Sequence, residues 1–151
     1  DDVLRIMKDS RIGSYGTVAL VMVLGIKALA LSSLPSASSA ALALLLAQPL
    51  SRWLAVSYLV DLQYVSGEGK SKPLATALPL SQWWLAGLAV LLPALFIDVG
   101  QWLLMTFSLL IFRIVFARYL RRRLGGYSGD ALGAAQQLSE LLIYLSLLVA
   151  L

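Results

Sequence analysis

The sequence of 151 residues contains neither cysteine nor histidine. These absences exclude disulfide bonds, zinc sites built from thiolate or imidazole ligands, and catalytic Ser-His or Cys-His pairs. Acid–base or metal chemistry would therefore depend on Asp and Glu, with Lys and Arg available to bind anions. Magnesium is the metal ion that suits such an oxygen-only ligand set.

Charged residues are also scarce, at 13% of the chain, whereas hydrophobic residues make up 60%. A soluble domain carries about 25% charged residues. The mean hydropathy of +0.84 agrees with this imbalance. The composition therefore predicts an integral membrane protein of the all-α class, a polytopic helix bundle.

The apolar residues gather in five runs, of which the third is short for a membrane span. We expect about five transmembrane helices, near residues 15–34, 37–60, 82–97, 101–119 and 134–151. A short amphipathic helix is expected before them, running up to Ser10. The sequence does not begin with Met, and we expect residues 1–151 to form a single transmembrane domain that is the C-terminal portion of a longer protein.

Basic residues alternate between the connections of these five spans. They occur before the first span, after the second and at the end of the fourth, and not at the other two connections. The positive-inside rule then places three polar stretches, K-D-S-R-I-G-S-Y-G (8–16), G-E-G-K-S-K (67–72) and R-R-R-L-G-G-Y-S-G-D (121–130), on the cytoplasmic side. They can therefore converge on one site.

The stretch L-G-G-Y-S-G-D-A-L-G-A-A, residues 124–135, combines glycines with a single acid just before the last apolar run. Glycine lets backbone amides approach a ligand closely, and a helix that begins there points its positive end at the ligand. Asp130 is then either a helix N-cap or a metal-binding carboxylate.

Four charged residues fall within the expected spans, where charge is costly and usually faces a bundle interior or polar cavity. For Arg52 and Arg113 the alternative is snorkelling to the cytoplasmic headgroups, and for Lys27 snorkelling to the far interface. Glu140 is alternatively a structural pair within the bundle. The triple arginine 121–123 is typical of membrane orientation and contact with anionic lipid. The tryptophans are typical of interfacial or packing residues.

These residues together resemble one known family. K-D-S-R-I-G-S-Y-G, then L-S-R-W, then E-G, then G-G-Y-S-G-D-A-L-G-A-A-x-x-L-S-E-L are similar, in order and spacing, to the cobalamin synthases (adenosylcobinamide-GDP ribazoletransferases). The resemblance implies a magnesium-dependent enzyme of the bacterial or archaeal inner membrane. It would join adenosylcobinamide-GDP to α-ribazole, or to its 5′-phosphate, to give adenosylcobalamin or its 5′-phosphate and GMP, the last step of cobalamin nucleotide-loop assembly.

The resemblance also implies roles for individual residues. Asp130 is expected to contact metal or ribazole, and Asp9 and Glu68 to form hydrogen bonds near the nucleophile, the ribazole 3′-hydroxyl. Guanidinium groups suit phosphate oxygens, so Arg11 and Arg52 are expected to bind the pyrophosphate. The remaining substrate-binding residues are expected in the loop that precedes Asp130, where the glycines leave room for the nucleotide: Gly125, Gly126, Ser128 and Gly129.

The sequence departs from the family in one respect. The family's acidic motif, D-G-x-x-D-x-x-D-G, is absent upstream of K-D-S-R, and this chain alone is expected to be inactive. Two other classes stay open: a CDP-alcohol phosphotransferase of lipid synthesis, whose own motif is absent here, and a non-enzymatic transport subunit. The lipid bilayer is the expected environment and no nucleic-acid partner is expected. A homo-oligomer and contacts with other nucleotide-loop assembly enzymes are left open.

Overall fold

The computed structural model describes residues 13–65 and 79–149, with the side chains of 89–94 outside the description. The described part of the chain is all helical apart from turns and one isolated β-bridge. Its five helices are α2 (Ser14–Ser32), α3 (Ala37–Asp61), α4 (Leu80–Ala94), α5 (Val99–Leu124) and α6 (Gly129–Val149). This confirms the predicted all-α bundle.

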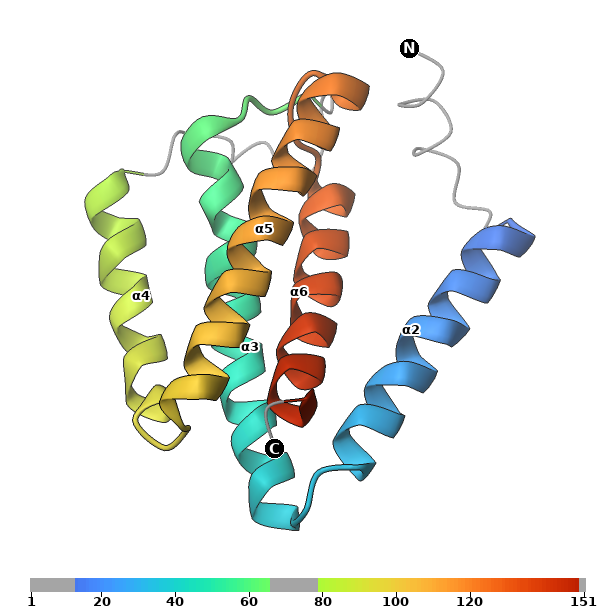
Figure 1. The fold of residues 1–151 in the computed structure, drawn as a ribbon. Coiled ribbons are helices and arrows are strands. Elements are labelled where there is room, and N and C mark those ends of the chain that lie inside the picture. The colour runs from blue at the N-terminus through green and yellow to red at the C-terminus, as the bar shows by residue number, and fades with distance from the viewer. Residues whose placement is uncertain (1–12, 66–78, 150–151) are drawn as a thin grey trace.

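Four of the five helices, all except α4, are long and apolar enough to cross a membrane. Helix α4 has only 15 residues, or about 22 Å at the helical rise. It nevertheless returns the chain from the end of the bundle where α3 stops to the end where α5 starts (Figure 1). By the composition of its helices, the chain is a multi-pass membrane protein.

The helices alternate in direction, so that one end of the bundle gathers the C-termini of α3 and α5 and the N-termini of α2, α4 and α6 (Figure 1). We call this end the polar end, because Asp61, the arginines 121–123 and Asp130 lie there. Of the three polar stretches expected to converge, 121–130 lies at this end, whereas most of 8–16 and all of 67–72 lie outside the described residues, so their convergence stays a prediction. The segments 1–12 and 66–78, and with them the expected amphipathic helix, lie outside the described residues.

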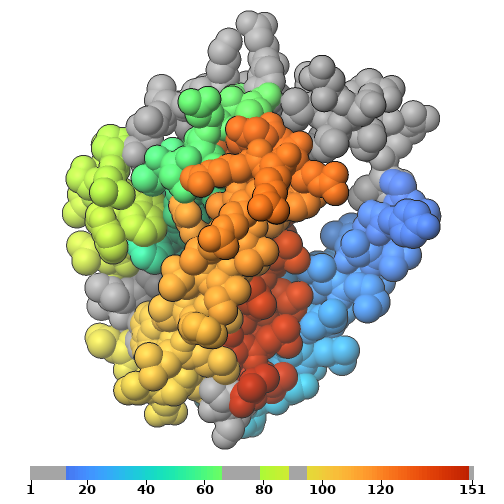
Figure 2. Space-filling model, turned by 45° about the horizontal axis from the view of Figure 1, so that its top comes forward, coloured from blue at the N-terminus to red at the C-terminus, as the bar shows by residue number. Residues whose placement is uncertain are grey.

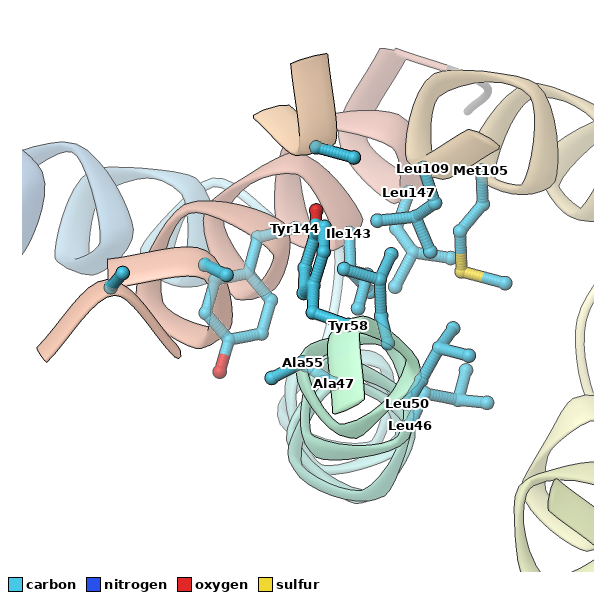
Figure 3. Close-up of a cluster of buried hydrophobic side chains, with 14 of the residues drawn as sticks. Leu46, Ala47, Leu50, Ala55, Tyr58, Met105, Leu109, Ile143, Tyr144 and Leu147 are labelled. Atoms are coloured by element: carbon cyan, nitrogen blue, oxygen red, sulfur yellow. The ribbon is translucent and has the colours of Figure 1, made fainter. Parts of the chain in front are cut away.

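Helix α3 is the centre of the bundle and packs most extensively against α6. Both helices have small, fully buried residues, Ala43 and Ala47 on α3 and Ala135 on α6. Small residues let two helix backbones approach closely, which is the usual way that helices associate where no hydrophobic effect drives them together. Larger core side chains from α3, α5 and α6 fill the space around this contact, including Leu46, Tyr58, Met105, Ile143, Tyr144 and Leu147 (Figure 3).

Helix α2 is splayed away from the bundle and has few buried residues (Figure 1). Many of its apolar side chains are exposed, such as Val18, Val21 and Met22. Only Lys27 and Ala30 are buried. Apolar residues exposed around a helix suit contact with lipid rather than water.

Helix α4 is attached to α3 by a pair of tryptophans. The indole rings of Trp53 and Trp83 stack with centroids 4.3 Å apart, and each indole N–H donates to the other residue's carbonyl oxygen, at 2.8 and 3.1 Å. Gly87 makes this packing feasible, because a Cβ there would lie 2.9 Å from two ring carbons of Trp53. The prediction that the tryptophans are packing residues is confirmed for this pair.

We predict that Gly87→Ala loosens α4 from α3, because the added methyl group must displace the Trp53 ring from its stack. Overpacking of this kind costs about 1–3 kcal/mol, measurable by unfolding of the purified protein in detergent. The matched control is Gly25→Ala in α2, where a Cβ would meet no atom within 4 Å. Equal stability of the two variants would contradict the packing role of Gly87.

Candidate functional site

A charged cluster joins α3 and α5 at the polar end. The carboxylate of Asp61, the last residue of α3, accepts from the Arg113 guanidinium at 2.6 Å and from that of Arg121 at 2.9 Å. Arg113 also donates to the backbone carbonyl of Ser57 at 3.3 Å, and its guanidinium lies over the Tyr58 ring, 5.4 Å from the centroid. Two guanidinium charges against one carboxylate leave the cluster with one net positive charge, which favours anion binding.

Backbone hydrogen bonds join the segment after α3 to the loop between α5 and α6. The amide N–H of Tyr127 donates to the carbonyl of Gln63 at 2.8 Å, and that of Val65 donates to the carbonyl of Tyr127 at 3.0 Å. The result is a parallel bridge between Tyr64 and Tyr127, whose rings meet edge to face at 5.5 Å. A Cβ on Gly126 would lie 2.0 Å from the Gln63 carbonyl oxygen, so only glycine fits this junction.

Tyr127 is buried where its segment pairs with residues 63–65. Burial raises the pKa of the Tyr127 phenol above its ordinary value, and the neighbouring Tyr64 raises it further. Tyr127 therefore stays protonated at neutral pH, where it can donate a hydrogen bond but cannot act as a base.

The α5–α6 loop is set by one glycine and one serine. Gly125 ends α5 in the left-handed conformation, with φ of 74°, which glycine adopts without steric cost. Its N–H donates to the carbonyl of Arg121 at 3.1 Å. The Ser128 hydroxyl accepts from the amide N–H of Ala131 at 3.2 Å and so caps the start of α6.

Asp130 is therefore not the N-cap of α6, as one of the two sequence interpretations had it. It lies within the first turn of the helix, one turn earlier than the expected start near residue 134, and its side chain is exposed. Asp130 has no ion pair with a described residue, and a carboxylate in the first turn is favoured by the helix dipole. The carboxylate is thus open to a ligand at the polar end.

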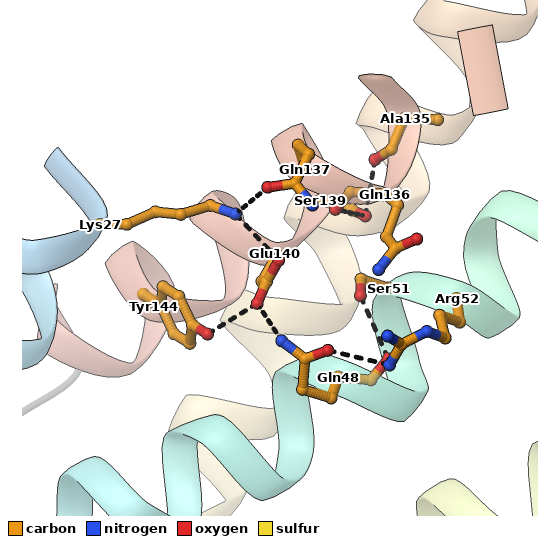
Figure 4. A network of polar contacts seen from close by, with 10 residues as sticks. All are labelled: Lys27, Gln48, Ser51, Arg52, Ala135, Gln136, Gln137, Ser139, Glu140 and Tyr144. Carbon is orange, nitrogen blue, oxygen red and sulfur yellow. Dashed lines mark hydrogen bonds and ion pairs between the residues drawn. The ribbon is translucent and has the colours of Figure 1, made fainter. Parts of the chain in front are cut away.

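A second polar cluster lies deeper, among α2, α3 and α6 (Figure 4). Lys27 of α2 donates to the Glu140 carboxylate of α6 at 2.8 Å and to the side-chain carbonyl of Gln137 at 2.6 Å. The other Glu140 oxygen accepts from the amide of Gln48 in α3 and from the hydroxyl of Tyr144 at 2.9 Å. Every acceptor oxygen of this buried carboxylate is thereby satisfied. We call these five residues the buried junction.

Arg52 is attached to the buried junction from outside. Its guanidinium donates to the side-chain carbonyl of Gln48 at 2.8 Å, and the Arg52 side chain is exposed. Arg52 is nine residues before Asp61, or about 14 Å along α3. The structure therefore places Arg52 below Asp61 along α3, in contact with Gln48 of the buried junction.

These contacts decide between the alternatives for the intramembrane charges. Glu140 is indeed paired within the bundle, as predicted. Lys27 does not snorkel to the far interface; that alternative is wrong, because Glu140 supplies a nearer partner in the bundle. Arg113 turns towards Asp61 rather than to open headgroups. Sequence reasoning missed Asp61 and Gln48, although a polar residue inside or at the end of an apolar run is a usable signal for both.

An apolar groove of about 650 Å³ lies between α3, α4 and α5. Trp53, Trp83 and Trp102 line it, and Arg113, the one charged residue in its lining, is engaged by Asp61. Phosphate chemistry needs several polar groups that converge on one point. The polar end, rather than this groove, is therefore the candidate functional site.

Three residues assigned to the site from sequence, Asp9, Arg11 and Glu68, lie outside the described residues. Within the described ranges no group of three or more acidic side chains could hold a metal ion. Asp130 alone offers one ligand, whereas Mg²⁺ takes six. The described residues therefore do not form a magnesium site by themselves.

Comparison with known proteins gives a consistent family assignment. Residues 1–148 match the family model described as cobalamin-5-phosphate synthase. Proteins named adenosylcobinamide-GDP ribazoletransferase are similar over nearly the whole chain. That of Vibrio cholerae is 48% identical over 147 residues, which cover 96% of this chain and 56% of the relative.

Two further relatives of the same name give the same result. The protein of Shewanella piezotolerans is 43% identical over 150 residues, covering 97% of this chain and 58% of the relative. The protein of Ralstonia pickettii is 41% identical over 149 residues, covering 98% and 58%. The chain thus spans somewhat more than half the length of these curated relatives. No solved structure matches it significantly.

We predict that Lys27→Met destabilises the protein strongly, because it leaves the buried Glu140 carboxylate without a cation. Breaking a buried ion pair costs about 3–5 kcal/mol, measurable by unfolding in detergent. The double variant Lys27→Met/Glu140→Gln is the control, since it removes both charges and should recover part of the loss. A double variant less stable than Lys27→Met would show that the pair does not act as a unit.

We also predict that Gly126→Ala disrupts the bridge between residues 64 and 127, because the new methyl group collides with backbone rather than with a flexible side chain. Amide hydrogen exchange at Tyr127 and Val65 should become faster. Gly133→Ala in α6, where a Cβ meets no atom within 4 Å, is the matched control and should leave this exchange unchanged. Unchanged exchange in Gly126→Ala as well would refute the close approach.

Proposed function

The chain belongs to the cobalamin-5-phosphate synthase family, and we propose that it is part of a membrane transferase that joins adenosylcobinamide-GDP to α-ribazole or its 5′-phosphate. The products are adenosylcobalamin, or its 5′-phosphate, and GMP. The family match over residues 1–148 is the observation that carries this proposal. It also favours this function over a CDP-alcohol phosphotransferase or a transport subunit.

In this reaction a hydroxyl oxygen of the ribazole forms a bond to the phosphorus nearer the cobinamide. The bond from that phosphorus to the oxygen of GMP breaks, and the hydroxyl proton passes to a base. Catalysis of such a transfer is mainly positioning and stabilisation of charge. The net positive Asp61 cluster and the N-terminus of α6 supply both at the polar end, which we place on the cytoplasmic side.

The individual roles are proposals at the positions that the structure describes. We assign Asp130 to contact the ribazole or the metal, and Arg52 to the pyrophosphate. Gly125, Gly126 and Ser128 of the loop, together with Gly129 at the start of α6, are proposed to lie beneath the nucleotide. Asp61 is not the base, because arginines occupy both of its carboxylate oxygens.

The remaining roles rest on the sequence alone. Asp9 and Glu68 are proposed to form hydrogen bonds near the nucleophile, and Arg11 to bind the pyrophosphate. Magnesium is the proposed metal ion and would supply positive charge to the phosphate oxygens. Because Asp130 is one ligand of the six required, we derive no step through the metal.

The function is tested with the whole protein in liposomes, supplied with adenosylcobinamide-GDP, α-ribazole and magnesium. We expect release of GMP together with the joined corrinoid, both detected by mass spectrometry and both dependent on each substrate. Folded protein that releases no GMP would overturn the proposal. Protection against unfolding by a CDP-alcohol would then favour the lipid phosphotransferase.

In the same assay we predict that Asp130→Asn lowers turnover, because the amide keeps the shape of the carboxylate but loses its charge. Losing such a group should cost about 10- to 100-fold. Asp98→Asn is the matched control, since Asp98 lies at the opposite end of the bundle, at the start of α5. Normal turnover in Asp130→Asn would remove this residue from the site.

A further inference from the structure

The last turns of α5 carry a positively charged pocket that the proposed reaction does not use. Arg118, Arg122 and Arg123 line a depression of about 400 Å³ together with Val115 and Tyr119. All three arginines are exposed. They recur three or four positions apart with Val115 and Tyr119, so the five residues share one side of the helix.

These arginines are separated from the candidate functional site by the helix itself. Arg121, on the same turn, is also exposed but is directed towards α3, where it pairs with Asp61 at 2.9 Å. Ala117 and Leu120 on that inner side are buried in the bundle. By contrast, the three outer arginines have no ion pair with an acidic side chain of the described residues. Among the described residues, no acidic side chain therefore compensates these three positive charges.

Below the pocket, the same outer side of α5 is apolar. Leu104, Phe107, Ile111 and Val115 follow one another at helical spacing, and all four are exposed. Figure 2 shows α5 crossing the front of the molecule, with its outer surface not covered by the other coloured helices. From Val115 to Leu104 this stripe extends about 17 Å, close to the roughly 15 Å thickness of one hydrocarbon leaflet.

We propose that this side of α5 is a binding site for an anionic phospholipid. The guanidinium groups of Arg118, Arg122 and Arg123 hold the lipid phosphate, and the apolar stripe lies along its acyl chains. Tyr119, with its phenol between the two regions, suits the interface itself. A free nucleotide could use the arginines but not the stripe, and this difference favours a lipid over a soluble phosphate. The proposal does not depend on the enzymatic function.

The site is tested by native mass spectrometry of the whole protein in detergent with added phosphatidylglycerol or phosphatidylcholine. We expect phosphatidylglycerol to bind more tightly. The triple variant Arg118→Gln/Arg122→Gln/Arg123→Gln should bind it roughly a hundredfold more weakly, at about 1 kcal/mol for each basic residue near the surface. The triple lysine variant keeps the charges and should retain most of the binding.

Arg121→Gln is the matched control, because it removes one charge from the same turn but from the inner side. It should bind phosphatidylglycerol as the wild type does. Three results would overturn the proposal: equal binding of the two lipids, unchanged binding in the triple glutamine variant, or displacement of the lipid by GDP. The last result would assign the arginines to the nucleotide instead.

Discussion

The relative positions of α2, α3 and α6 depend on one buried carboxylate, that of Glu140, which needs partners inside the bundle. A charge inside a membrane protein is tolerated only where partners compensate it. Glu140 obtains these partners from three helices, with Lys27 from α2, Gln48 from α3 and Tyr144 from its own helix. Sliding or turning any of the helices would leave a donor or acceptor unsatisfied. The buried junction therefore determines how far α2, α3 and α6 are shifted along one another. Packing between apolar side chains alone would not determine this shift, because such contacts have no fixed partners. For α2, which is otherwise splayed and exposed, it is the main buried attachment to the rest of the bundle.

Fixing the register at Glu140 also fixes what meets at the polar end. Glu140 is ten residues beyond Asp130, or about 15 Å along α6, and Gln48 is thirteen residues before Asp61, about 20 Å along α3. Because α3 and α6 are antiparallel and packed together, the end of α3 meets the start of α6. There the backbone pairing of residues 63–65 with 127 joins them. Two interactions thus position the α5–α6 loop. The ion pair of Glu140 sets the register of α6, and backbone hydrogen bonds join the loop to residues 63–65, where Gly126 allows the close approach of Gln63.

Much of this arrangement could be predicted from the sequence, because the apolar runs are long and are separated by polar connections. Their lengths predicted the five helices that the structure shows, and the distribution of lysine and arginine predicted that the polar stretches lie at one end, where the structure places 121–130. The runs did not reveal which side of each helix faces which neighbour. Hence snorkelling to the far interface stayed open for Lys27 although Glu140 lies within reach, and Asp61 was passed over although two arginines converge on it. The start of α6 was placed too late, because Ser128, rather than Asp130, caps it. The spacing of residues along the chain predicts how deep each residue lies in the bundle. Which residue it contacts depends on how each helix is rotated about its own axis, and the spacing does not predict this rotation.

That rotation also explains how one basic cluster serves two purposes. Successive residues of a helix turn by about 100°, so adjacent arginines cannot all face the same environment. In α5, Arg121 turns inward with Arg113 and shares Asp61 with it. Arg118, Arg122 and Arg123 turn outward, where no acid of the described residues meets them. Arg113 and Arg121 keep one positive charge in excess beside the loop that precedes Asp130, which suits a phosphate-bearing substrate. The outer three place their charge where the bilayer surface lies. The basic residues at the end of α5 therefore form two sets. One set belongs to the candidate functional site, and the other faces outward, where we propose that it binds anionic lipid.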